Sequence, residues 1–275
     1  MGYIYTAAAG TRRGAGRVNI IASLAAAGAI GLAAGVLGAM SINVAIAAAG
    51  ASVNDKPAAQ FISSGSFSGG TVTEGMVLSG IRFGKHRGFT RMVLDLEPIA
   101  AGQGERSPAS AHPVYSVRYE PYPYRLSIHL EGVRFEAEGS VQSKPALPFS
   151  IVTSADRTIK ELQVYLGGPV EFKLIEIDDP AKLSIDVRPH GGIAIPNIFA
   201  VQLMQPLSAA EAFALVERGS FPDGYSPSAL VLGEVVVVEQ AFTDPGLAAS
   251  MDADLRAMGY ASIINERRGD ELPQR

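Results

Sequence analysis

Basic side chains are concentrated in one short segment: Arg82, Lys85, His86, Arg87 and Arg91 lie within ten residues that include no acidic residue. The segment spans a predicted turn between two strands. Long cationic side chains make charge-assisted hydrogen bonds to carboxylates of a ligand or of an acidic partner. The alternative is a solvated sheet edge, where charge prevents pairing with another strand. We predict that these residues bind a ligand, with edge protection as the alternative.

Tyrosines are frequent in the next predicted strands, where Tyr115, Tyr119, Tyr122 and Tyr124 lie close together in the sequence. Tyrosine rings can stack on sugar faces. Tyrosine is also favoured in strands for packing alone. The chain has no Trp, and any aromatic ligand platform would therefore use Tyr or Phe. Tyr115 and Tyr119 join the basic segment as candidate ligand-binding residues.

Signatures of catalysis are missing from the sequence. The chain has no Cys and only four His, at positions 86, 112, 129 and 190, without the His-Glu-x-x-His pair of zinc hydrolases. It also lacks the serine-hydrolase elbow, the P-loop and the dinucleotide-binding glycine motif. Asp178-Asp179-Pro180 pairs two carboxylates, but this composition favours a turn. We predict no enzyme activity, no metal and no cofactor.

Charge is distributed unevenly along the 275 residues. The chain has 23 basic and 27 acidic residues, and residues 1–54 hold three Arg and no acid. Subtracting these leaves 23 − 3 = 20 basic against 27 acidic residues, a balance of −7. Proteins that bind nucleic acid need a basic face to displace phosphate counterions. We therefore exclude nucleic acid as a partner.

The N-terminal fifth carries a long uncharged run. No charged residue occurs from Val18 to Val53, about 36 residues, whereas a membrane span needs about 20. Arginines precede the run, which predicts a cytoplasmic segment 1–17, a transmembrane helix at 18–50 and export of the rest. We therefore predict a single-pass protein of the inner membrane with its C-terminal region in the periplasm. The alternative is export with cleavage of the run as a signal peptide.

Glycines recur within this run at helical spacing. Gly28, Gly31, Gly35 and Gly38 fall on one face of a predicted helix. Small residues at this spacing allow two membrane helices to pack closely, which predicts a homodimer through the membrane helix. The alternative is that a segment rich in Ala and Gly produces such spacing by chance.

The exported region is predicted to begin with a tether and continue as strands. Residues 51–76 are rich in Ser, Gly and Ala, a composition typical of flexible coil. Hydrophobic alternation with period two then appears at Met92–Leu96 and Tyr124–Leu130. The segment 123–130 is similar to the segment 180–187, and each follows another predicted strand. Two such halves predict a β-sandwich over residues 77–189.

One motif in this region carries a family resemblance. Gly80-Ile81-Arg82-Phe83-Gly84 leads to the strand Thr90-Arg91-Met92-Val93-Leu94-Asp95-Leu96. Together with the two similar hairpins, this stretch resembles the AMIN family, non-catalytic modules found beside bacterial cell-wall amidases and some outer-membrane secretins. The resemblance implies an AMIN-like β-sandwich at 77–189 and binding to the cell envelope.

Residues 196–268 follow a different pattern, with predicted strands alternating with helices. Ser208 and Glu211 form a capping box for a helix that runs to about Arg218, and Gly259 ends a second helix at 244–258. Val201-Gln202, Ala241-Phe242 and the segment 255–260 are similar to SPOR domains, which bind septal glycan. The resemblance implies a SPOR-like α/β domain of βαββαβ order.

The predicted fold class is thus mainly β plus α+β, with an N-terminal transmembrane helix, an AMIN-like β-sandwich and a C-terminal SPOR-like domain. The predicted function is binding of peptidoglycan, through its glycan or its stem peptide. Two alternatives remain open. The protein can be an envelope scaffold that binds another protein without wall contact, or a cell-wall hydrolase whose active site lacks a known motif.

Overall fold

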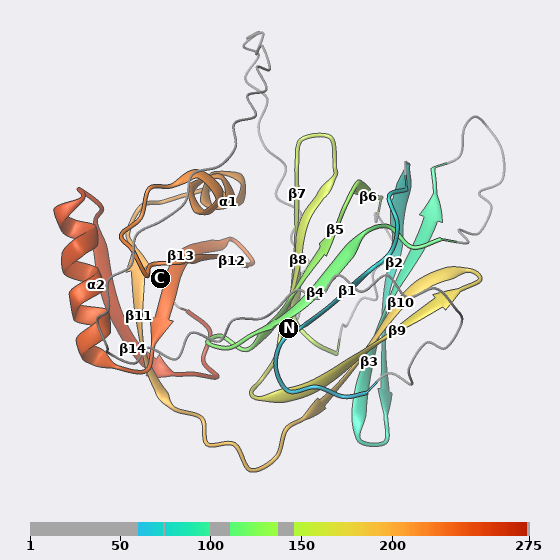
Figure 1. Ribbon diagram of the computed structural model, residues 1–275, viewed down its shortest axis with the longest axis horizontal. Helices are drawn as coiled ribbons and strands as arrows, with labels where there is room; N and C mark the ends of the chain where they lie inside the picture. The colour runs from blue at the N-terminus through green and yellow to red at the C-terminus, as the bar shows by residue number, and fades with distance from the viewer. Residues whose placement is uncertain (1–59, 74, 100–110, 137–145, 274–275) are drawn as a thin grey trace, which may run out of the picture. The chain divides into compact units, whose positions relative to one another are not determined.

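The computed structural model describes residues 60–73, 75–99, 111–136 and 146–273 (Figure 1). These residues belong to one compact unit. They form three β-sheets, and the strands dominate the secondary structure. The predicted cytoplasmic segment 1–17 and the predicted membrane span 18–50, with Gly28, Gly31, Gly35 and Gly38, lie outside the described residues.

Two five-stranded sheets form a β-sandwich. The first sheet has the order β1 (Ser66–Gly69), β4 (Tyr115–Glu120), β5 (Arg125–Leu130), β8 (Ile159–Tyr165) and β7 (Phe149–Thr153). The second sheet has the order β6 (Val133–Phe135), β2 (Met76–His86), β3 (Phe89–Pro98), β10 (Ala181–Pro189) and β9 (Val170–Asp178).

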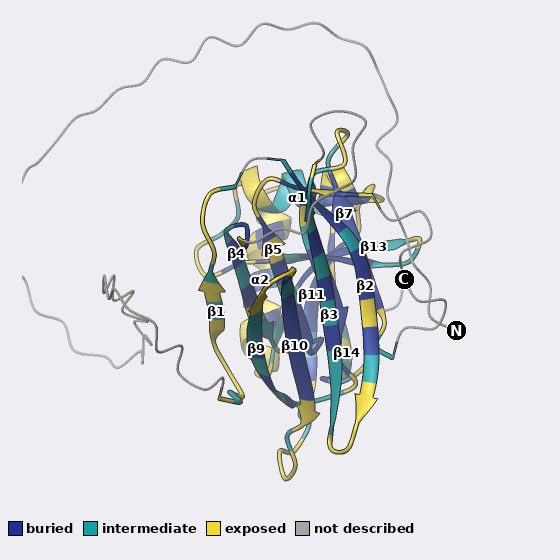
Figure 2. Cartoon of the chain, turned by 90° about the vertical axis from the view of Figure 1, so that its right-hand side faces the viewer, coloured by how far each residue is buried: buried dark blue, intermediate teal, exposed yellow. Residues whose placement is uncertain are grey.

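The core of the sandwich follows from alternation along the strands. On β5, Leu126, Ile128 and Leu130 are fully buried, whereas the residues between them face the other way. Successive side chains of a strand point to opposite faces, and one apolar face per sheet therefore suffices to build a core. Figure 2 shows the buried stripes along β10 and β3. Inward residues of both sheets form a single apolar cluster.

A third sheet, with the order β12 (Ser228–Leu232), β13 (Val235–Phe242), β11 (Asn197–Leu203) and β14 (Ser262–Arg268), is built from the C-terminal part of the chain. Helices α1 (Ala209–Arg218) and α2 (Pro245–Ala257) connect its strands in the order β11-α1-β12-β13-α2-β14. Ser208 and Glu211 cap α1 reciprocally, which satisfies backbone N–H groups at the helix start.

The fold class predicted from the sequence is wrong. The described residues are mostly strand, arranged in three sheets with two helices, and neither helix is long and apolar enough to cross a membrane. The composite of a membrane helix with an AMIN-like sandwich and a SPOR-like domain is therefore not the fold class of the described residues. Its transmembrane helix is predicted from the length of the uncharged run at residues 18–50, which lie outside the described residues.

Part of the predicted tether also pairs as a strand. Residues 66–69 form β1, which is antiparallel to β4, and Ile62 bridges Phe172. The ring of Phe67 meets the ring of Phe172 edge to face at 5.3 Å. Backbone pairing with β4 and this aromatic contact explain why a segment rich in Ser and Gly is ordered here.

Candidate functional site

Two members of the predicted basic site are bound to carboxylates of their own sheet. Arg82 donates two hydrogen bonds to Asp95, at 2.6 and 2.7 Å. Arg91 donates to both carboxylate oxygens of Asp186, at 2.6 and 2.8 Å. Lys173 also approaches Asp186, at 3.3 Å. Because these guanidinium groups are already paired, neither presents an unpaired cation to a ligand.

The remaining members lie at the tip of the β2–β3 hairpin. Lys85, His86 and Arg87 are exposed, and the His86 ring stacks on Phe89 with 4.7 Å between centroids. Gly88 takes the turn with φ +91°, a conformation that favours glycine. This tip is a solvated turn whose side chains are exposed.

The predicted tyrosines face the core of the sandwich. Tyr115 is only 4% exposed and its hydroxyl donates to Glu176 at 2.6 Å. Tyr119 packs its half-buried ring near Phe172 and Tyr124, with centroids 6.1 and 6.3 Å away. Burial raises the pKa of both phenols. The structure thus places the basic residues on the second sheet and both tyrosines within the sandwich, and does not bring the two groups together into one pocket.

A different polar surface stands out on the outward face of the first sheet. Across neighbouring strands, Arg118 lies opposite Ser127, and Ser127 lies opposite Gln163. In the next row, Glu120 lies opposite Arg125. The outward residues of β4, β5 and β8 all carry polar groups: Ser116, Arg118, Glu120, Arg125, Ser127, His129, Glu161, Gln163 and Tyr165. We call this surface the polar floor.

The third sheet is attached to one side of the polar floor by hydrogen bonds to β12. Gln163 is completely buried; its Nε2 donates to the Ala229 carbonyl at 2.6 Å, and its Oε1 accepts from the Val231 amide at 3.0 Å. The Tyr165 hydroxyl lies 2.9 Å from the Val231 carbonyl. Val152 adds apolar packing against Ala209 and Val231. The attachment covers the β7–β8 side and leaves the β4–β5 side open.

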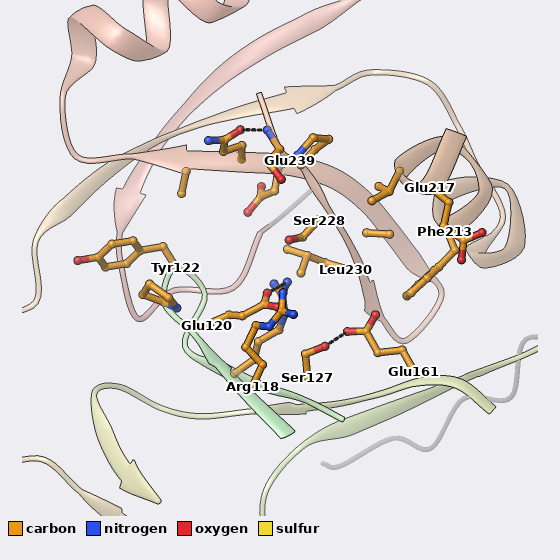
Figure 3. A pocket seen from close by; sticks show the side chains of 18 of the residues that line it. Arg118, Glu120, Tyr122, Ser127, Glu161, Phe213, Glu217, Ser228, Leu230 and Glu239 are labelled. Atoms are coloured by element: carbon orange, nitrogen blue, oxygen red, sulfur yellow. Dashed lines mark hydrogen bonds and ion pairs between the residues drawn. The ribbon is translucent and has the colours of Figure 1, made fainter. Parts of the chain in front are cut away.

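The open side is a cleft of about 820 Å³. Ligand sites typically have volumes of about 300–1,000 Å³. Its roof is formed by α1, β12 and β13, and Figure 3 shows Phe213, Glu217 and Glu239 on the roof side and Arg118, Ser127 and Glu161 on the floor side. We call it the polar cleft; its other lining residues include Arg125, His129, Lys160, Ser226, Ser228 and Gln240.

Arg125 is the most deeply buried cation of the polar cleft, at 3% exposure. One terminal nitrogen is bonded to Glu120 across the β4–β5 pair. Its Nε is buried, and no group of the described residues accepts a hydrogen bond from it. An unsatisfied buried donor costs about 1–3 kcal/mol. Such a cost is tolerated at sites where a ligand or water completes the bonding.

Glu161 is the corresponding acidic group on β8. The Ser127 hydroxyl donates to its Oε1 at 2.6 Å, and Gln163 donates to the same oxygen at 3.3 Å. No described residue donates to Oε2. Burial raises the pKa of Glu161, although the bond from Ser127 and the nearby charge of Arg125 act in the opposite direction. A nearby cation stabilises the ionised form of a carboxylate whose charge is disfavoured by burial.

A buried carboxylate in the roof, Glu239, is already paired. Glu239, at 3% exposure, receives two hydrogen bonds from Arg267. Burial raises the pKa of Glu239, and the bonds from Arg267 oppose that shift. Glu239 therefore contributes to the structure of the roof.

Other charged residues of the polar cleft remain exposed. Arg118 on β4, Lys160 on β8 and Glu217 on α1 line it, and none forms an ion pair with a residue that the structure describes. His129 is exposed as well, and its Nδ1 lies 3.0 Å from the Lys160 carbonyl. Within the described ranges, no group of His, Asp or Glu could hold a metal ion. The arrangement is suited to recognising a charged, polar ligand.

The sequence pattern does not predict this site, although it indicates part of the polar face. Alternation along 124–130 predicts that Arg125, Ser127 and His129 share the polar face of a strand. A polar face usually meets water, and nothing in the local pattern indicated that it would be partly covered by β12. Gln163 and Tyr165, which are buried on the same face, lie on the side that β12 covers.

The AMIN-like and SPOR-like resemblances stay predictions from sequence motifs. The function of the chain is therefore argued from the polar cleft. No family model, no curated protein and no solved structure matches this chain.

Proposed function

We propose that this protein binds peptidoglycan in the bacterial cell envelope, without cleaving it, and that the polar cleft is the binding site. Placement in the envelope rests on the uncharged run at 18–53 and stays a prediction from the sequence. A protein partner without wall contact is the alternative that the experiment below separates from wall binding.

One observation carries the proposal: a row of outward polar side chains on the first sheet is roofed by α1 and the third sheet, yet several of its charges stay unpaired among the described residues. Arg118 and Lys160 have no ion-pair partner among the described residues, and Arg125 keeps an unbonded Nε. Surface charges that serve only solubility need no roof, whereas ligand sites gain strength from partial exclusion of water. Peptidoglycan offers hydroxyls, amides, amines and carboxylates for these groups.

Sedimentation with purified, protein-free cell wall tests this function. The full chain should pellet with the wall, and the double variant Arg118→Gln/Lys160→Gln should remain largely in the supernatant. Lys85→Gln/Arg87→Gln, which removes the same charge from the exposed hairpin tip, is the matched control and should pellet like the parent protein. Equal pelleting of all three proteins, or none by the parent, would reject the polar cleft as a wall site.

Hydrolysis of glycan is a second candidate function, favoured by one specific observation. Glu161 and Glu120 line the same cleft in different environments. Burial raises the pKa of Glu161, whereas Glu120 is ion-paired with Arg125. Glycosidases use such a pair, with one carboxyl group protonated and the other ionised.

The same sedimentation tube distinguishes the two functions. An enzyme would release soluble wall fragments with time, and Glu161→Gln would abolish the release. The binding function predicts no release from the parent protein over hours. Release that depends on Glu161 would replace binding with hydrolysis as the function of the cleft.

A further inference from the structure

The polar floor has a net positive end at Arg118 and Arg125, where Glu120 pairs with Arg125, and a carboxylate, Glu161, on another strand. Arg118 on β4 and Arg125 on β5 are diagonal neighbours, at a typical separation of about 7–8 Å. Glu161 lies on the next strand, β8, beyond Ser127. Because neighbouring strands lie about 4.8 Å apart, β4 and β8 are separated by roughly 10 Å. The floor therefore has a positive pole and a negative pole at a distance that a short peptide can span.

Each pole retains unused bonding capacity. At the positive pole, the Nε of Arg125 has no acceptor and Arg118 has no ion pair within the described residues. At the negative pole, both hydrogen bonds to Glu161 reach Oε1, and Oε2 receives none from a described residue. Glu217, exposed on α1, is a further carboxylate in the lining of the cleft. A ligand with only one charge would satisfy one pole and leave the other unpaired.

We propose that the polar cleft binds the peptide part of the wall at a segment with a free primary amine and a free carboxylate, the carboxylate on Arg118 and Arg125 and the amine on Glu161. This inference rests on the proposed function and specifies its ligand class. A neutral glycan chain offers neither charge. Guanidinium groups bind carboxylates through paired hydrogen bonds, and a partly buried carboxylate such as Glu161 makes a charge-assisted hydrogen bond to an ammonium group.

Lys160 is the one other exposed cation that lines the cleft, and it lies next to Glu161 in the sequence. It has no ion-pair partner among the described residues. Removing Lys160 should leave the recognition of the amine by Glu161 intact and weaken only the general attraction of wall carboxylates to the cleft. Removing Arg118 should weaken recognition of the carboxylate alone. The two substitutions thus separate positional recognition from general attraction of an anion to a basic surface.

Calorimetric titration of the full chain with small probes tests the ligand class. The probe is N-acetyl-lysyl-alanine, which carries one amine and one carboxylate. Its C-terminal amide lacks the carboxylate, its side-chain acetylated form lacks the amine, and N-acetylglucosamine trimer represents the glycan. Each charge deletion in the ligand should weaken binding about tenfold or more, since one charge-assisted hydrogen bond is lost. The trimer should bind no better than the peptide that lacks both charges, with its side chain acetylated and its C-terminus amidated.

Protein variants connect each ligand charge to its pole. Arg118→Gln should weaken binding of the parent probe about tenfold and leave binding of the amide unchanged. Glu161→Gln should likewise weaken binding of the parent probe about tenfold and leave binding of the acetylated form unchanged. Lys85→Gln is the control and should change nothing. Equal binding of the acid and the amide, or preference for the glycan trimer, would overturn the inference. If the wall pellets the protein but no probe shows this pattern, the ligand class is wrong and the proposed function stands; if neither wall nor probes bind, both fail.

Discussion

The outward faces of the two sandwich sheets are both rich in charge but use it differently. On the second sheet, Asp186 is held by Arg91 and Lys173, and Asp95 by Arg82 with Lys182 at 3.6 Å. Arg188 is likewise paired with Glu171 at 2.5 Å. On the first sheet, the polar cleft leaves Arg118 and Lys160 without ion pairs among the described residues.

The contrast separates charges that belong to the fold from charges that are available to a ligand. Cross-strand ion pairs satisfy each other and offer little to a third group. Unpaired charges under a roof keep their electrostatic attraction for a ligand, and partial burial strengthens it. Counting basic residues along the sequence points to the hairpin of the second sheet, whereas pairing in the structure points to the first sheet.

The largest expected effect concerns the attachment of the roof, on which the comparison depends. Gln163→Ala removes a completely buried side chain that satisfies the Ala229 carbonyl and the Val231 amide. Leaving these groups unsatisfied should lower the free energy of unfolding by about 3 kcal/mol and weaken ligand binding with it. Urea unfolding followed by circular dichroism measures the loss.

Gln163→Glu provides the matched control because it keeps the shape and the acceptor oxygen but loses the donor to Ala229. It should be destabilised by less than Gln163→Ala at low pH, where the new carboxyl group is protonated and can donate again. If Gln163→Ala unfolds like the parent protein, the hydrogen bonds to β12 do not hold the roof in solution.

The next effect concerns the paired face. Arg91→Gln removes the two hydrogen bonds to Asp186, whose side chain is fully buried. Stability should fall by about 2 kcal/mol, less than for an isolated buried charge, because Lys173 still approaches the carboxylate. Wall binding by the folded variant should equal that of the parent protein. If the Arg91→Gln variant is fully folded and yet binds the wall more weakly than the parent protein, Arg91 belongs to the ligand site.

The same pair predicts a pH dependence. Burial alone would raise the pKa of Asp186, but Arg91 and Lys173 outweigh it and lower that pKa below its usual value. A lowered pKa stabilises the fold above the unfolded value, near pH 3.9, and this contribution is lost as the pH falls through the folded pKa. The stability difference between the parent protein and Arg91→Gln should therefore be largest near neutral pH and shrink as the pH falls toward and below about 4. A difference that grows in acid would contradict the assignment.

Glu161→Gln should affect binding and stability in opposite directions. Because burial raises the pKa of Glu161, its ionised form is disfavoured in the folded protein at neutral pH. The neutral amide should leave stability unchanged or raise it by up to about 1 kcal/mol at pH 7, and the gain should vanish near pH 4, where the parent carboxyl is protonated. Thermal unfolding at both pH values checks this. A clear loss of stability at pH 7 would mean that the charge serves the fold.

The smallest effect is expected at the hairpin tip. Lys85→Gln/Arg87→Gln changes two exposed side chains, and stability should shift by less than about 0.5 kcal/mol. Binding to the wall should be unchanged at low and at moderate salt. Salt-sensitive loss of binding in this variant would return the ligand site to the basic segment that the sequence indicated.

Local patterns predicted much of the strand content but not the site. Alternation at Met92–Leu96 and Tyr124–Leu130 predicts strands whose inner residues are buried in the structure. The capping box at Ser208 and Glu211 also forms as the sequence indicates. Pairing across 95 positions, as between Arg91 and Asp186, has no local signal, and the basic segment therefore looked available. The residues of β8 and β12 that contact each other are also far apart in the sequence. No local pattern therefore predicts the cleft.

The central claim is that unpaired charges under the roof bind the wall, whereas exposed charges of the hairpin do not. Comparative sedimentation of Arg118→Gln/Lys160→Gln and Lys85→Gln/Arg87→Gln with purified cell wall tests it most directly, because both variants lose two exposed positive charges. The first variant should bind the cell wall about tenfold or more weakly than the parent protein, and the second should keep the parent's affinity. Equal losses in the two variants, with both proteins folded, would contradict it.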